Sequence, residues 1–90
     1  MEIKRMKERL QEKIEQIEQM EELTEEEQGY LDGFKEAKRI IEENTNREEI
    51  VNQLRKCHSI NTAESEYKAG KFKQMKWVYS LLKKNNYWYY

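Results

Sequence analysis

Apolar residues recur every three or four positions along most of this chain, the spacing that places side chains on one face of an α-helix. In the first twenty residues the apolar positions are Ile3, Met6, Leu10, Ile14, Ile17 and Met20. This pattern predicts an amphipathic helix over residues 2–22. One unbroken helix over residues 2–43 is the alternative, because neither proline nor glycine separates Met20 from Thr24.

A capping signal favours a new helix after Thr24. Thr24 and Glu27 have the spacing of a capping box, in which each side chain accepts a hydrogen bond from the backbone amide of the other residue. A second helix is therefore predicted over residues 25–43. Its apolar face comprises Tyr30, Phe34, Ala37, Ile40 and Ile41.

Two further helices follow in the second half of the chain. Thr45 or Asn46, each three residues before a glutamate, caps a third helix over residues 47–58, and Asn61 or Thr62 caps a fourth over residues 62–85. The inward residues of the third helix are Ile50, Val51, Leu54 and Cys57, and those of the fourth are Tyr67, Phe72, Met75, Val78, Tyr79 and Leu82. An aromatic tail, residues 86–90, ends the chain.

These elements predict an all-α fold of three or four helices packed as two helical hairpins. Ninety residues with 37% apolar content support one small domain. A weak repeat at an offset of 37 residues aligns Tyr30 and Gly33 with Tyr67 and Gly70. A glycine inside a helix costs about 0.5 to 1 kcal/mol relative to alanine. Two glycines at matching places therefore suggest close helix crossings, where each admits a neighbouring backbone or a large ring.

The net charge of −1 hides two halves of opposite charge. Residues 1–49 contain nine Lys/Arg and sixteen acids, whereas residues 50–90 contain eight Lys/Arg and two acids. Such a division fits nucleic-acid contact by one end, acidic mimicry of nucleic acid by the other, or mutual neutralisation within a monomer or a homodimer.

The acidic half contains the first candidate site. Seven acids and no base lie from Glu15 to Glu27. This run is either a solvated helix face or a docking surface that steers a basic partner. The aromatic tail either closes over the core or anchors a partner. The predicted partner-binding residues are Glu15, Glu18, Glu22, Glu25, Glu26, Trp88, Tyr89 and Tyr90.

The basic half contains an alternative, nucleic-acid site. Lysines on one side of the fourth helix lie beside an indole ring, and such a surface holds phosphates and stacks bases. The residues of this alternative site are Lys73, Lys76, Trp77, Lys83 and Lys84. A solvated face, or pairing with the acidic helix of the same or a second chain, explains the same pattern.

Catalytic and metal-binding signals are absent from the sequence. Cys57 and His58 are the only thiol and imidazole, and neighbouring helix residues point about 100° apart, which disfavours a nucleophilic pair. A structural zinc site needs four such ligands. We expect no enzyme activity, no cofactor and no metal. No apolar stretch approaches the roughly 20 residues of a membrane span. One cysteine, without a basic-apolar leader, favours the reducing cytoplasm.

The segment Glu27-x-x-Tyr30-x-x-Gly33-Phe34-x-x-Ala37, followed by Ile40-Ile41, resembles a pattern in short helical proteins of phages and mobile elements. The rich use of Lys, Glu, Asn, Ile and Tyr is similar to that of low-GC Gram-positive genomes. The resemblance implies a counter-defence or host-takeover protein that blocks a host complex, as anti-CRISPR proteins do, or a regulator of phage genes. It implies no site residues. We therefore expect a non-enzymatic inhibitor or adaptor, with a nucleic-acid-binding regulator and a self-assembling structural protein as alternatives.

Overall fold

The computed structural model describes the backbone of residues 3–44, 46–58 and 65–87, and the side chains of these residues except 57–58 and 83–87. The residues so described form four helices, α1 (Ile3–Glu18), α2 (Glu25–Glu43), α3 (Arg47–His58) and α4 (Glu66–Tyr87). The described residues form no strand. The all-α prediction is confirmed.

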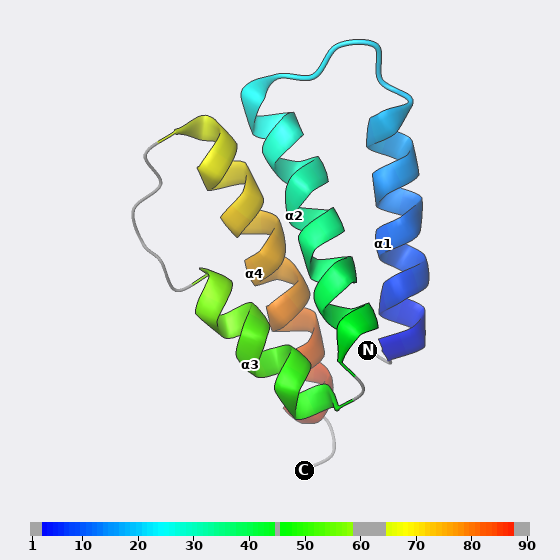
Figure 1. Ribbon diagram of the computed structural model, residues 1–90, viewed down its shortest axis with the longest axis vertical. Helices are drawn as coiled ribbons and strands as arrows, with labels where there is room; N and C mark the ends of the chain where they lie inside the picture. Colours follow the sequence, from blue (N-terminus) through cyan, green and yellow to red (C-terminus); the bar gives the residue numbers. More distant parts are fainter. Residues whose placement is uncertain (1–2, 45, 59–64, 88–90) are drawn as a thin grey trace.

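The helices pack as a bundle around α2 and α4 (Figure 1). α2 and α4 run in the same direction and make the most extensive contact of the structure. α1 packs beside α2, and α3 packs beside α4, each in the opposite direction to its neighbour. Consecutive helices thus pair as the two predicted hairpins. The two pairs are joined through α2 and α4, which are distant in sequence.

The first helix is shorter than predicted. α1 ends at Glu18, not at residue 22, and the unbroken helix over residues 2–43 does not form. The amide of Met20 donates to the Ile17 carbonyl (3.0 Å), which tightens the last turn. Continuing this helix would place Glu21 and Glu22 at the negative end of the helix dipole, where acids are unfavourable. Met20, predicted on the apolar face, is instead 44% exposed.

Side-chain caps fix the starts of the other helices. Thr24 and Glu27 form the predicted capping box at the start of α2. Asn46 caps α3, because its side-chain oxygen accepts from the Glu48 amide (2.8 Å). Thr45, the other predicted cap, lies outside the described residues. At α4 the cap is Ser65, whose hydroxyl accepts from the Lys68 amide (3.2 Å).

The predicted bounds of the fourth helix differ from the structure at both ends. α4 begins at Glu66, whereas residue 62 was expected, and it continues to Tyr87. The predicted caps Asn61 and Thr62 lie outside the described residues. Asn86 and Tyr87, assigned to the tail, are helical, while Trp88, Tyr89 and Tyr90 lie outside the described residues.

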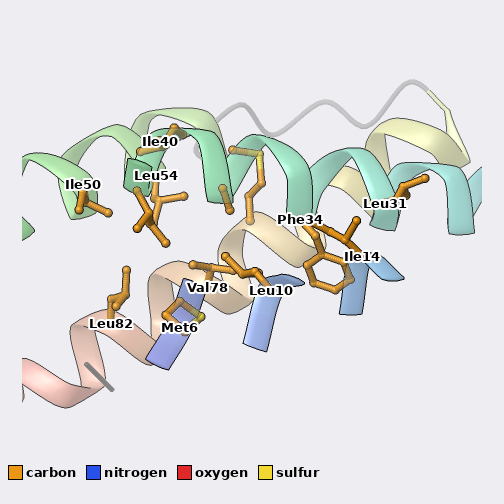
Figure 2. Packing of buried hydrophobic residues seen from close by; sticks show 13 residues of the cluster. Met6, Leu10, Ile14, Leu31, Phe34, Ile40, Ile50, Leu54, Val78 and Leu82 are labelled. Atoms are coloured by element: carbon orange, nitrogen blue, oxygen red, sulfur yellow. The ribbon is translucent and has the colours of Figure 1, made fainter. Parts of the chain in front are cut away.

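The apolar faces of all four helices meet in one core (Figure 2). Each helix contributes side chains at the predicted three- and four-residue spacing. The half-buried rings of Tyr30, Trp77 and Tyr79 border this core. The buried hydrophobic residues are Met6, Leu10, Ile14, Leu31, Phe34, Ala37, Ile40, Ile41, Ile50, Leu54, Met75, Val78 and Leu82.

All three glycines of the chain lie where α2 crosses α4. A Cβ on Gly33 would lie 2.7 Å from the Lys71 carbonyl oxygen, and one on Gly70 would lie 2.5 Å from that of Glu26. Gly29, which the repeat does not include, makes the closest approach, to the Tyr67 carbonyl. The close crossing expected from Gly33 and Gly70 is therefore present. Because glycine has no side chain, the two backbones can pack together at these positions.

Loss of the α2 cap is expected to have a moderate cost. Thr24→Ala removes the acceptor of the Glu27 amide (3.1 Å), so the free energy of unfolding should fall by about 1 kcal/mol. Thr24→Ser keeps the hydroxyl and should lie within about 0.5 kcal/mol of the parent. Urea unfolding followed by circular dichroism measures both. Equal losses for the two variants would contradict a capping role.

Candidate functional site

The glutamates predicted to bind a partner gather at one end of the bundle. We call this region the acidic end. It comprises Glu15, Glu18, Glu21, Glu22, Glu25 and Glu26, all exposed. These residues do not share one helix face, because α1 ends at Glu18 and the chain turns before α2. They instead surround the connection from α1 to α2 (Figure 1).

Part of the acidic end stabilises the fold. Glu18 forms an ion pair with Lys35 of α2 (3.5 Å), and Glu15 accepts from the Gln11 amide (3.0 Å). Glu25 and Glu26 lie in the first turn of α2, where negative charge is favourable at the positive end of the helix dipole. Glu26 also accepts from the Tyr30 hydroxyl, and this hydrogen bond raises the pKa of Tyr30.

The rest of the acidic end is not neutralised. Within the described residues, Glu21, Glu22 and Glu25 form no ion pair. Met20, the only exposed large hydrophobic residue of that part of the chain, lies between Glu18 and Glu21. An apolar side chain amid uncompensated carboxylates is suited to contact a partner with a basic surface.

The lysines of the alternative site and its indole differ from one another in exposure. Lys73 and Lys76 are exposed on α4, whereas the side chains of Lys83 and Lys84 lie outside the described part. Trp77 is half-buried and packs edge-on against Phe34 of α2, with 6.1 Å between the ring centroids and 75° between the ring planes. The indole is therefore part of the helix packing and not a fully open platform.

Helix α1 adds two cations to this site that sequence reasoning did not include. The Arg9 guanidinium lies 5.4 Å from the Trp77 ring centroid, and the Lys13 ammonium lies 5.3 Å from it. Both distances are within the range of cation–π attraction. Arg5, one turn before Arg9, is exposed. Spacing by four along α1 was the available signal, but it does not show that this side of α1 turns toward Trp77.

A further cation lies over an aromatic ring of α2. The Lys73 ammonium is 5.8 Å from the centroid of the Tyr30 ring, and Lys13 is 6.0 Å from that of Phe34. Three helices thus combine into one feature, which we call the basic-aromatic surface. It comprises Arg5, Arg9, Lys13, Tyr30, Lys73, Lys76 and Trp77, and the buried ring of Phe34 lies beneath it.

Asp32 serves the contact between α2 and α4. The Tyr67 hydroxyl of α4 donates to one carboxylate oxygen of Asp32, and the Gln28 amide donates to the other (3.3 Å). The Asp32 hydrogen bond raises the pKa of Tyr67, because it favours the protonated phenol. The carboxylate is thus engaged in joining helices, and this arrangement supports a structural role.

The described residues have neither a metal-binding cluster nor a membrane-spanning helix. They contain no group of three or more His, Cys, Asp or Glu residues that is arranged to hold a metal ion. None of the helices, over the residues described, is long and apolar enough to cross a membrane. The side chains of Cys57 and His58 lie outside that description.

Comparison with known proteins gives no relative: no family model, no curated protein and no solved structure matches this chain.

Proposed function

We propose that this protein is a non-enzymatic protein-binding module that docks its acidic end on a basic surface of a larger complex. The observation that carries the proposal is the set of six exposed glutamates, which forms a single ion pair, Glu18 with Lys35, within the described residues. The resemblance to phage and mobile-element proteins suggests the biological setting. In that setting the module is an inhibitor or adaptor that occupies a host or defence complex.

The acidic end supplies steering and orientation more than affinity. A cluster of one sign of charge accelerates encounter with an oppositely charged surface. Individual exposed ion pairs contribute only about 0 to 1 kcal/mol, so apolar contacts must provide the remaining affinity. Met20 is one such contact. The aromatic tail residues Trp88, Tyr89 and Tyr90 remain the predicted anchor, since large rings supply interface energy at low entropic cost.

Neutral variants of the acidic end test the proposal. Glu15, Glu22 and Glu25 are replaced together by glutamine, which keeps side-chain size and leaves the Glu18–Lys35 pair intact. Tagged protein is used to capture partners from a nuclease-treated lysate of a low-GC Gram-positive bacterium. The parent is expected to retain a defined complex, and the triple variant at least tenfold less of it, because lost steering lowers the association rate.

A matched control separates local charge from net charge. Glu8, Glu48 and Glu49 are exposed and lie away from the acidic end. Their replacement by glutamine changes the net charge equally. This control should retain the complex, and circular dichroism should show both triple variants to be helical. Association with the purified complex should also slow with added salt. Full retention by the acidic-end variant, or equal loss in the control, would contradict the proposal.

A further inference from the structure

We infer that the basic-aromatic surface is a second binding site, which takes single-stranded nucleic acid through its phosphates. This site is separate from the acidic end and does not depend on the function proposed for it. Its new element is the contribution of α1, whose Arg9 and Lys13 meet Trp77 of α4 in three dimensions.

The cations of this surface lack carboxylate partners. Within the described residues, none of its five cations forms an ion pair, and these cations are Arg5, Arg9, Lys13, Lys73 and Lys76. The basic residues along α2 differ, since Lys35, Lys38 and Arg39 each pair with glutamate. Glu8 and Glu12 line the same surface hollow of α1 as Arg5, Arg9 and Lys13. In the described part of the chain neither acid forms an ion pair with these cations, and the five cations of the surface outnumber the two acids. A polyanion therefore finds unneutralised charge on one part of this nearly neutral molecule.

The cations are arranged in two sets that suit an extended anionic chain. Arg5, Arg9 and Lys13 follow one another at intervals of four residues, so they span about 12 Å along α1. Lys73 and Lys76 are exposed on α4, the helix that carries the half-buried ring of Trp77. Successive phosphates of a strand can pair with both sets. Each phosphate bound displaces condensed counterions, which makes affinity fall with salt.

Aromatic rings between the cations favour a nucleic acid over an acidic peptide. Lys13 and Arg9 lie over the Trp77 ring, and Lys73 lies over Tyr30. A phosphate that pairs with one of these cations draws it off the ring, and an unpaired base can occupy the vacated face. Base stacking on such rings contributes about 1 to 3 kcal/mol per base. The bases of a duplex are stacked on one another and cannot reach the rings, so a single strand is the better fit.

Charge reversal on α1 tests the site. Binding of a fluorescein-labelled oligothymidine of about 20 nucleotides is measured by fluorescence anisotropy between about 50 and 200 mM KCl. Arg9→Glu with Lys13→Glu should lower affinity at least tenfold. It should also reduce the slope of log affinity against log salt by about 1.4, because each phosphate contact to a single strand contributes about 0.7. Lys4→Glu with Arg55→Glu, an equal charge change at exposed positions elsewhere, should change affinity less than twofold.

Further measurements keep the test informative if reversal on α1 disturbs folding. Lys73→Glu with Lys76→Glu removes cations from α4 alone and should produce the same loss. In a Trp88→Phe background Trp77 is the only indole, and oligothymidine should quench its fluorescence. The inference would be overturned if the parent did not bind at low salt, or if it bound a 20-base-pair duplex more tightly than oligothymidine. Equal competition by poly-glutamate, absence of quenching, or an equal loss of affinity in the control variant would also overturn it.

Discussion

Replacing Gly29 with alanine is expected to lower the free energy of unfolding by about 3 kcal/mol or more, the upper range for overpacking. A Cβ at this position would lie inside the contact distance of the Tyr67 carbonyl oxygen and 2.9 Å from the Lys71 amide nitrogen. Both neighbours are backbone atoms of α4, so relief requires the two helices to separate. A chain of 90 residues has a typical stability of about 5 to 13 kcal/mol, and the loss would be a large share.

The expected change in stability at Gly29 is opposite in sign to that at an ordinary helix position. At an unhindered helix position, glycine to alanine stabilises by about 0.5 to 1 kcal/mol. Ala69→Gly, at an exposed position of α4, measures that intrinsic preference in this protein and should cost about 1 kcal/mol. Urea unfolding followed at 222 nm reports both variants. Unchanged or increased stability in Gly29→Ala would show that the helices do not cross as closely as the structure has them.

The same crossing shows what the sequence could and could not predict. Gly33 and Gly70 were recognised from the repeat, and the spacing Gly29-x-x-x-Gly33 was a second available signal for close packing. The local sequence pattern does not identify which helix packs against these glycines. The partner proved to be α4, more than thirty residues away, and hairpin pairing alone would have favoured a sequence neighbour.

The sequence predicts helix ends correctly where interactions between residues a few positions apart determine them. α2 runs over the predicted residues because its ends depend on side chains a few positions apart, namely the Thr24–Glu27 box and Asn44, whose amide donates to the Ile40 carbonyl (2.8 Å). α1 was predicted four residues too long, because apolar spacing continues to Met20 whereas the acids that follow disfavour a longer helix.

The candidate sites depend on contacts between helices, which limits prediction from sequence. Exposure of the acidic-end glutamates follows from their position opposite the apolar stripe of α1 and around the α2 cap. That Lys35 pairs with Glu18, and that Arg9 and Lys13 lie over Trp77, follows only from the placement of α1 beside α2 and near α4. Charge counts alone could not assign the cations of α1 to the same surface as those of α4.

Replacing Leu10 with alanine is expected to lower the free energy of unfolding by about 3 to 4 kcal/mol, within the range for a buried leucine. Leu10 is 0% exposed, and α1 has only two other buried side chains, Met6 and Ile14. The substitution leaves a cavity between α1 and the rest of the core, where the close-packed helices can relax only in part. Guanidinium unfolding followed by circular dichroism measures the loss.

A second leucine-to-alanine substitution distinguishes this core contact from a general sensitivity to the loss of a leucine side chain. Leu23 lies between α1 and α2 and is half-buried, so Leu23→Ala removes the same atoms with less lost burial and should cost no more than about 1.5 kcal/mol. Equal losses of stability would mean that Leu10 is not a principal contact between α1 and the core.

The Leu10 substitution should also affect the basic-aromatic surface. Because Arg9 is the neighbour of Leu10 on α1, a loosened α1 should withdraw the Arg9 guanidinium from Trp77. Leu10→Ala should therefore weaken oligothymidine binding even under conditions where the variant is fully folded, whereas Leu23→Ala should not.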